Sequence, residues 1–360
     1  MAIESHLLTV RDVVVETADA RSIVFEVPEE LSETFAYVPG QFLTLAIPSE
    51  QTGLVARSYS LSSAPHENRH QVTVKRTAEG YASNWICDHL RPGDTVRVLP
   101  PSGIFTPRDW NSDVLLFAGG SGITPILSIA RTALERHDGA VTLFYANRDE
   151  ASVIFAATLR QLQDEHPDRF EIVHWLESLQ GIPSAEALRR FAQRHSDATA
   201  MVCGPGPFMS AVTGVLKDLE FPRERRQQEK FVSLGGNPFG DVPEMVGVAT
   251  KTDDSGGASS ATGGLVAGPV RVEVHLDDQD YAFDDWNGRE PLLVFLESKG
   301  VDAPYSCREG QCSACACMVL EGDLALLHNE VLEADDLADG IRLACQAVAL
   351  SNEVRVTYNG

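Results

Sequence analysis

The sequence predicts three domains: an antiparallel β-barrel, an α/β domain built on a parallel sheet, and a small α+β domain. Residues 1–108 contain short segments in which apolar and polar side chains alternate. In residues 109–234, β-rich apolar runs alternate with helical stretches. A segment rich in Gly, Ser, Ala and Thr, 235–268, has the composition of a flexible linker and precedes residues 269–360. A length of 360 residues fits two or three domains of ordinary size.

The expected elements follow the same order. Turn signals separate five barrel strands, at 9–17, 21–27, 41–47, 71–77 and 94–101. Four apolar runs, typical of buried parallel strands, occupy 114–120, 141–147, 170–176 and 199–205. In the last domain we expect a strand at 270–278, its hairpin partner at 280–284, a helix at 291–300 and a final strand at 353–359.

Composition excludes several function classes. The formal net charge of −23 disfavours nucleic acid as a partner, because a phosphate backbone is bound by Lys and Arg. No run approaches the roughly 18–20 apolar residues of a membrane span, and the first residues do not resemble a signal peptide. We therefore expect a soluble, cytoplasmic protein.

Four cysteines carry the most specific chemical signal. Cys307, Cys312 and Cys315 have the spacing C-x4-C-x2-C and Cys345 follows in a separate segment, which is the arrangement of plant-type [2Fe–2S] sites. Gly310 and the small residues around it allow the backbone to wrap closely and point N–H groups at the sulfurs.

A structural zinc site is the main alternative, but zinc sites usually pair cysteines in two short knuckles. A disulfide framework fits poorly with seven cysteines in a long chain. Cys317 does not fit the ligand spacing, and we interpret it as a packed free thiol.

Two segments of the barrel region indicate a flat, phosphate-bearing ligand. In 57–65, the guanidinium of Arg57 can pair with a pyrophosphate, and Tyr59 can lie against an aromatic ring. Small residues at 80–83 precede an expected helix at 84–90 and suit an anion. Arg and Tyr alternate on many exposed strands, so the first segment alone is weak.

Two segments of the α/β region indicate a dinucleotide. Gly119, Gly120 and Gly122 permit a tight turn after a strand, and Thr124 and Pro125 begin the next helix. The segment 203–209 (CGPGPFM) ends a later strand, where open α/β sheets place ligands. Cys203 can alternatively be a small core residue.

With these motifs in their order, the chain resembles the ferredoxin–NADP reductase superfamily with a plant-type ferredoxin domain at the C-terminus. Segments 37–65, 74–90, 145–155 and 174–181 are most similar to the reductase components of 3-ketosteroid 9α-hydroxylases, with those of phenylacetyl-CoA epoxidases as a sister group. The resemblance implies an FAD-binding barrel, an NAD(P)-binding α/β domain and a β-grasp [2Fe–2S] domain.

The resemblance also implies roles for individual residues. It implies that Ser60 lies near the reactive edge of the flavin, and that Cys203, Glu229 and Phe231 act with it in catalysis. The implied FAD contacts are Arg57, Ser58, Tyr59, Ser60, Val74, Arg76, Gly80, Tyr81, Ala82, Ser83 and Phe231. The implied dinucleotide contacts are Gly119, Gly120, Gly122, Thr124, Pro125, Arg148, Cys203, Gly204, Pro205 and Gly206.

The implied function is an NAD(P)H-dependent reductase that passes electrons through FAD and a [2Fe–2S] cluster to a separate terminal oxygenase, which the resemblance implies to be of the Rieske type. A different oxygenase, such as the phenylacetyl-CoA epoxidase, is the alternative partner. A redox-sensing iron–sulfur module without turnover is the alternative from another class. Arg148 suits the 2′-phosphate of NADPH, but Asp149 and Glu150 beside it disfavour that charge, so we expect NADH.

Overall fold

The computed structural model describes residues 5–49, 53–78, 80–231, 239, 266, 269–276, 279–301, 303–305, 308–332 and 334–358. Within these ranges, no helix combines the length and the apolar character that a membrane span requires.

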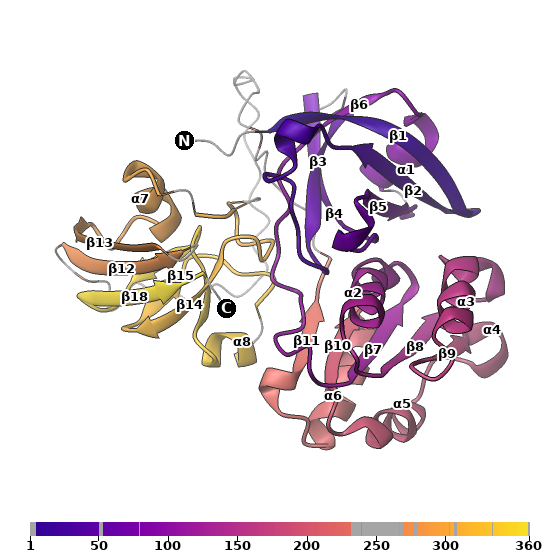
Figure 1. The fold of residues 1–360 in the computed structure, drawn as a ribbon. Helices are drawn as coiled ribbons and strands as arrows, with labels where there is room; N and C mark the ends of the chain where they lie inside the picture. Colours follow the sequence, from indigo (N-terminus) through magenta and orange to yellow (C-terminus); the bar gives the residue numbers. More distant parts are fainter. Residues whose placement is uncertain are drawn as a thin grey trace. The chain divides into compact units, whose positions relative to one another are not determined.

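The first sheet is an antiparallel barrel (Figure 1). Its strands are β1 (His6–Thr17), β2 (Ala20–Glu26), β3 (Phe42–Ser49), β4 (Gly53–Ser60), β5 (His70–Lys75) and β6 (Thr95–Val98). They are ordered β4-β3-β6-β1-β2-β5, and a bridge between Leu61 and Val72 joins the two outer strands. This closure confirms the predicted barrel and leaves fewer unpaired edges.

The helix of the barrel region, α1 (Tyr81–His89), begins three residues earlier than the predicted start at Asn84. Gly80 is its N-cap residue, and the amide of Asn84 donates a hydrogen bond to the Gly80 carbonyl (3.4 Å). Tyr81, Ala82 and Ser83 therefore form its first turn. Their small or aromatic side chains gave no apolar periodicity from which this turn could be predicted.

The second sheet is wholly parallel, in the order β11-β10-β7-β8-β9. Its strands are β7 (Val114–Gly119), β8 (Val141–Asn147), β9 (Phe170–Leu176), β10 (Thr199–Cys203) and β11 (Arg226–Glu229). Its helices are α2 (Ile123–Arg136), α3 (Ala156–Glu165), α4 (Glu177–Gln180), α5 (Ala185–Ala192) and α6 (Gly206–Asp218). Every residue of the central strand β7 is buried, as expected for a strand covered on both faces.

Side-chain alternation along β7 divides the core of this sheet. Leu116 faces the cluster that includes α2 and α3, whereas Leu115 and Phe117 face the cluster that includes α5 and α6. Figure 1 shows these helix pairs on opposite sides of the sheet. Both faces are thus covered, which leaves the carboxyl ends of the strands as the position for a ligand.

The barrel and the parallel sheet belong to one compact unit, Ser5–Ile47 with Arg57–Phe231. Ala20, the first residue of β2, and Phe105, which follows β6, join the apolar cluster around α2. The hydroxyl of Ser128 on α2 donates to the carbonyl of Ser63 (2.6 Å, buried), and Arg131 on the same helix forms an ion pair with Glu67. These contacts fix the two sheets relative to each other.

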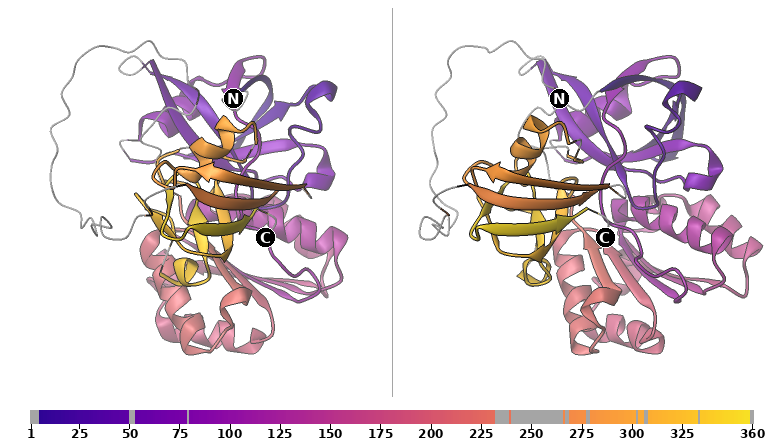
Figure 2. Two further views of the ribbon diagram at one scale, coloured as in Figure 1. Left: turned by 90° about the vertical axis from the view of Figure 1, so that its left-hand side faces the viewer. Right: turned by 60° about the vertical axis from the view of Figure 1, so that its left-hand side comes forward.

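The C-terminal part is built on a mixed sheet, ordered β13-β12-β18-β14-β16. Its strands are β12 (Val270–Leu276), β13 (Gln279–Trp286), β14 (Ala316–Glu321), β16 (Ile341–Leu343) and β18 (Glu353–Thr357); β15 (Leu324–Leu326) pairs with β17 (Ala347–Ala349). Helices α7 (Leu292–Ser298) and α8 (Ala334–Ala338) complete it. The parallel β12–β18 pair and α7 against one face (Figure 2) confirm the β-grasp prediction.

The predicted linker, 235–268, lies outside the described residues apart from Phe239 and Val266. The domain boundaries at 108, 234 and 268 therefore stay a prediction.

Candidate functional site

Two glycine loops predicted to bind a dinucleotide pack directly against each other. Gly120–Gly122 forms a 3-10 turn between β7 and α2, and Gly204 follows β10, the strand next to β7. A Cβ on Gly122 would lie 2.2 Å from the carbonyl oxygen of Cys203, and one on Gly204 would lie 3.0 Å from the Cα of Gly119. Only glycine allows this approach, so the two motifs form one backbone-lined surface at the carboxyl ends of adjacent strands.

The remaining residues of these motifs support the same surface. Thr124 and Pro125 lie in the first turn of α2, where the hydroxyl of Thr124 donates to the carbonyl of Ser121 (3.1 Å). Pro205 caps α6 and Gly206 begins it. The Cδ atom of Pro205 lies 2.8 Å from the position that a Cβ on Gly119 would take.

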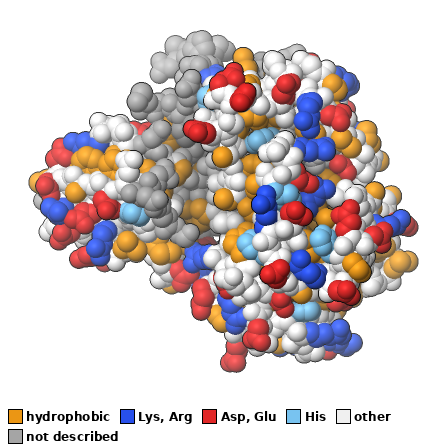
Figure 3. All heavy atoms as spheres, in the orientation of Figure 1, with side chains coloured by type: hydrophobic (Ala, Val, Ile, Leu, Met, Phe, Trp, Pro, Cys, Tyr) orange, Lys and Arg blue, Asp and Glu red, His pale blue; other side chains and the backbone are white. Residues whose placement is uncertain are grey.

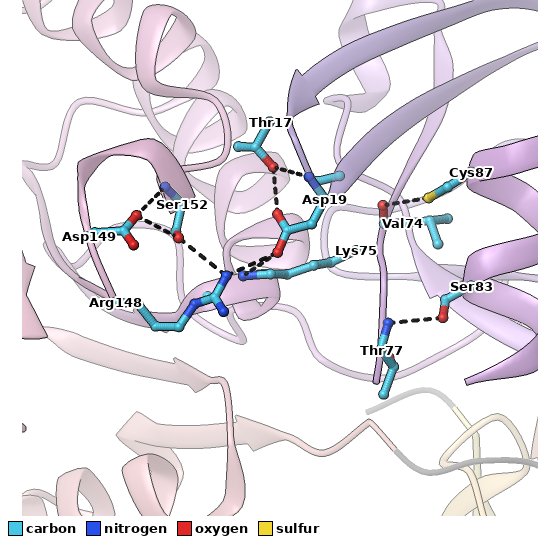
Figure 4. Close-up of polar contacts among 12 residues, drawn as sticks. Thr17, Asp19, Val74, Lys75, Thr77, Ser83, Cys87, Arg148, Asp149 and Ser152 are labelled. Atoms are coloured by element: carbon cyan, nitrogen blue, oxygen red, sulfur yellow. Dashed lines mark hydrogen bonds and ion pairs between the residues drawn. The ribbon is translucent and has the colours of Figure 1, made fainter. Parts of the chain in front are cut away.

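A small cluster of charges lies beside this surface, where the barrel meets the parallel sheet (Figure 4). The carboxylate of Asp19, in the β1–β2 turn, accepts a hydrogen bond from Arg148 (3.1 Å) and lies 3.9 Å from the Lys75 ammonium. Lys75 lies 3.8 Å from the Cβ position of Gly120, so it reaches the glycine loop. Two cations, Lys75 and Arg148, and one anion, Asp19, thus lie together beside the glycine loop. The carboxylate of Asp19 neutralises part of the positive charge.

Asp149, which we predicted to disfavour a further negative charge beside Arg148, also has a structural role. Its carboxylate caps the short turn that follows β8, accepting hydrogen bonds from the amide (2.9 Å) and hydroxyl (2.7 Å) of Ser152. The carboxylate that forms an ion pair with Arg148 is that of Asp19, from 129 positions earlier in the chain. Sequence proximity could not reveal this pairing, because it depends on how the barrel packs on the sheet.

The predicted flavin segment lies on and beyond β4. Arg57, Ser58 and Tyr59 are partly buried and Ser60 is buried. The hydroxyl of Ser58 lies 3.0 Å from that of Thr44 on the barrel. Burial raises the pKa of the Tyr59 phenol, which keeps it protonated at neutral pH.

The second predicted flavin segment forms a tight turn before α1 (Figure 4). The Thr77 amide donates to the hydroxyl of Ser83 (3.1 Å), and a Cβ on Gly80 would lie 2.9 Å from that of Thr77. The side chain of Val74 is fully buried, so only its backbone can face a ligand. Arg76 is held by α1, through Asn84 (3.2 Å) and an ion pair with Asp88.

The predicted catalytic group spans the edge pair β10–β11. Cys203 is opposite Glu229 in the parallel register and is fully buried in the core around α2. Burial raises the pKa of the Cys203 thiol, and the nearby Glu229 carboxylate raises it further. Burial also raises the pKa of Glu229 to about 8. Phe231 follows β11 and is 51% exposed.

Three of the four predicted cluster ligands lie within the described residues. Cys312, Cys315 and Cys345 are buried, whereas Cys307 lies outside the described residues. The amide of Ala344 donates to the carbonyl of Cys315 (3.0 Å), which ties the Cys345 segment to the loop. Among the described residues, no three His, Cys, Asp or Glu side chains lie close enough together to hold a metal ion, and the predicted ligand Cys307 is not one of these residues.

The loop geometry suits a bound cluster. Arg308 and Gly310 have positive φ values of 60° and 72°, and a Cβ on Gly310 would lie 2.6 Å from the carbonyl oxygen of His328. Gln346 donates to the Arg308 carbonyl (2.8 Å), and Arg308 forms an ion pair with Glu297 of α7. Cys317, by contrast, lies on β14 in register with Arg342, within the sheet. Cys312 and Cys315 on this loop, with Cys345 from a separate segment, are thiol ligands of the kind that hold a [2Fe–2S] cluster.

Sequence reasoning missed Asp19, Lys75 and Tyr358. Lys75 lies within the predicted strand 71–77 and ends the observed strand β5. Its position after the apolar residues of that strand was the signal that could have identified it. Tyr358 follows the last strand, and its hydroxyl is buried without a hydrogen-bond partner among the described residues. Neither Asp19 nor Tyr358 belongs to a recognisable motif.

Comparisons with known proteins match all three parts. Residues 7–106 match the family model "Oxidoreductase FAD-binding domain", residues 116–214 "Oxidoreductase NAD-binding domain", and residues 274–350 "2Fe-2S iron-sulfur cluster binding domain".

The chain is also similar to named proteins over nearly its whole length. It is 47% identical to the 3-ketosteroid-9-alpha-monooxygenase ferredoxin reductase component of Rhodococcus rhodochrous, covering 98% of this chain and 97% of that one. It is 32% identical to a component of the 1,2-phenylacetyl-CoA epoxidase of Escherichia coli, covering 98% of each. The solved structure of a phthalate dioxygenase reductase has the same fold, with a TM-score of 0.55, 23% identity and 98% coverage of both chains.

Proposed function

This chain belongs to the family of three-domain reductases that use a nicotinamide dinucleotide, FAD and a [2Fe–2S] cluster to supply electrons to an oxygenase, and from that premise we propose that it is the reductase component of a 3-ketosteroid 9α-monooxygenase. The observation that carries this proposal is the 47% identity to such a component over 98% of the chain. The identity to an epoxidase component is lower, 32% over the same share, so the steroid system is the favoured one.

When bound, FAD would supply the exchange between the two electrons of a hydride and the single electrons that the cluster can accept. The residues of the chain would bind the dinucleotide and FAD and orient them. We assign the backbone of Gly119–Gly122 and Gly204–Gly206 to the dinucleotide, and Arg57, Tyr59 and the 80–83 turn to FAD. Cys203 and Glu229 lie in register at the end of the site, and burial raises the pKa of both groups.

We propose NADH as the donor, on the ground of charge. The guanidinium of Arg148 is the group next to β8 that suits a 2′-phosphate, but it is bound by Asp19. A 2′-phosphate would have to displace that carboxylate or lie beside it, and either costs electrostatic energy. The ribose hydroxyl of NADH carries no such penalty.

The partner is a terminal oxygenase component, which we propose to be of the Rieske type, because the cluster domain delivers single electrons. The organic substrate would bind the oxygenase and not this chain. We place the pair in the cytoplasm, where NADH is regenerated.

Reconstitution tests the proposal. The purified holoprotein, with a 3-ketosteroid 9α-oxygenase, NADH and a 3-ketosteroid, should yield 9α-hydroxylated product; with the epoxidase oxygenase and phenylacetyl-CoA it should yield little. Anaerobic titration with NADH and then NADPH, followed by flavin and cluster absorbance, separates electron entry from partner choice. Equal or better coupling to the epoxidase would contradict the steroid assignment while leaving the reductase activity intact.

A further inference from the structure

A buried hydroxyl next to the cysteine segments has no partner in the protein. The Oη atom of Tyr358 is shielded from solvent, and no described residue accepts or donates a hydrogen bond to it, thiol groups included. Buried polar groups are nearly always paired, because leaving one unpaired is unfavourable. A partner that is not one of the described side chains is therefore expected.

Strand register places Tyr358 on the same face as the cysteines. The antiparallel pair β14–β18 matches Met318 with Thr357 and Val319 with Val356, so the next pair in the ladder is Cys317 with Tyr358. Residues opposite each other in such a pair point to the same side of the sheet. Val354 and Val356, at alternate positions before Tyr358, are fully buried in the cluster that also contains Cys315, Cys317 and Cys345.

The backbone holds Tyr358 firmly in this position. Its amide donates to the carbonyl of His275 on β12 (2.9 Å), which continues the parallel β12–β18 ladder by one residue. Its side chain packs against the buried apolar cluster that contains Cys315, Cys317 and Cys345. The ring therefore lies beside the part of the core that holds these cysteines, and its hydroxyl can act as a donor.

We propose that Tyr358 donates a hydrogen bond to a sulfur of the [2Fe–2S] cluster and thereby raises the reduction potential of the cluster. This rests on the proposed function only in taking the four cysteines as cluster ligands. Hydrogen bonds to cluster sulfurs are among the groups that set such potentials. Reduction adds one negative charge to the cluster, so a fixed donor stabilises the reduced form more than the oxidised form.

Replacing the hydroxyl alone tests this. In the full-length holoprotein, Tyr358→Phe keeps the ring and the backbone bond to His275. We expect the cluster midpoint potential, measured by anaerobic titration with EPR detection, to shift to a lower value. The FAD midpoint in the same samples should not move, which makes it an internal reference.

Tyr281→Phe is the matched control. Tyr281 lies on β13 in the same part of the chain, and its hydroxyl donates to Gln279 at the exposed surface (2.8 Å). This variant should leave both midpoints unchanged. An unchanged cluster midpoint in Tyr358→Phe, or an equal shift in both variants, would overturn the proposal.

A second measurement covers the case in which Tyr358→Phe fails to assemble its cluster. Site-specific 3-fluorotyrosine at position 358 is a stronger donor of nearly the same shape, so the cluster midpoint should rise. Pulsed EPR of the reduced protein should also show a strongly coupled exchangeable proton that responds to this substitution. A midpoint that falls, or a proton spectrum that is unchanged, would contradict a donor role.

Discussion

At the residue scale, Gly122 determines whether the two dinucleotide loops can meet. The carbonyl of Cys203 occupies the space where a side chain would begin, at 2.2 Å from the Cβ position. The atoms nearest this position belong to the backbone of Cys203 and Gly204, so no flexible side chain can move to relieve the contact. The glycine pattern was therefore predictable from the sequence, but the partner loop that requires it was not.

We predict that Gly122→Ala lowers dinucleotide affinity at least about tenfold, because the loop must move away from β10 to relieve the clash. Isothermal titration of the holoprotein with NAD⁺ measures this. The control is Gly214→Ala on α6, where an added Cβ meets nothing within 4 Å; it should stabilise the protein by about 0.5–1 kcal/mol. Equal affinities in the two variants would contradict the packing argument.

Asp19 is the residue at which donor preference is most directly testable. We predict that Asp19→Asn raises the ratio of kcat/KM for NADPH to that for NADH by about fivefold, equivalent to about 1 kcal/mol, because a partly exposed ion pair contributes at most about that much. Asparagine keeps an acceptor for the Thr17 hydroxyl, which now donates to Asp19 (2.8 Å). Steady-state dye reduction with each donor gives this ratio for the variant and for the parent protein.

Asp218→Asn, which breaks the exposed ion pair with Arg189 (2.9 Å) on α5, is the control and should leave the ratio unchanged. If Asp19→Asn behaves in the same way, Arg148 does not lie at the 2′-phosphate position.

At the element scale, strands were predictable and the start of α1 was not. Apolar runs such as 114–120 and 141–147 became β7 and β8 because both faces of a parallel sheet are buried. The start of α1 depends on the turn of Thr77 and Gly80 against Ser83, a contact without a periodic signal. The cysteine spacing identified the cluster, whereas Tyr358 required the β14–β18 register.

The loop and the strand that carry cysteines should respond differently to substitution. We predict that Ser in place of Cys307, Cys312, Cys315 or Cys345 abolishes or severely reduces the cluster. Cys317→Ser should retain it, because this residue lies within the β14 ladder. Iron and sulfide content of the five purified variants is the measurement. Retention on changing Cys315, with loss on changing Cys317, would refute the ligand assignment.

Glu229, the last residue of β11, should make the free energy of unfolding depend on pH. Burial raises the pKa of Glu229 from 4.5 to about 8, so between these values the folded protein holds a proton that the unfolded chain releases. This contribution to the free energy of unfolding is full below pH 4.5 and decreases as the pH rises through 8. We predict that Glu229→Gln reduces this slope between pH 5 and 8, measured by urea unfolding. Glu224→Gln, at an exposed position, should keep the slope of the parent protein.

At the scale of the whole molecule, charge is distributed unevenly along the chain. Residues 269–360 carry 18 Asp and Glu against 6 Lys and Arg, a net charge of −12 out of −23. Acidic side chains lie beside basic ones on the face that Figure 3 shows. Asp284 pairs with Arg271 (3.1 Å) and Asp285 with Lys299 (2.5 Å), yet their side chains stay 78% and 65% exposed. The acidic residues that we expect to face a partner are Asp277, Asp278, Asp284, Asp285, Glu333, Asp335 and Asp336. Of these, Asp277, Asp278 and Glu333 lie outside the described residues.

This excess can serve solubility alone or can steer the cluster domain onto a basic surface of the oxygenase. Steering predicts a strong decrease in electron delivery to the oxygenase as ionic strength rises, because the screening length falls from about 10 Å at 0.1 M to about 3 Å at 1 M. NADH-driven dye reduction by the same protein should decrease much less, because a small dye does not depend on docking. Both rates can be followed in one salt series with stopped-flow absorbance. Equal salt dependence in the two assays would reject steering and leave solubility as the role of the acidic residues.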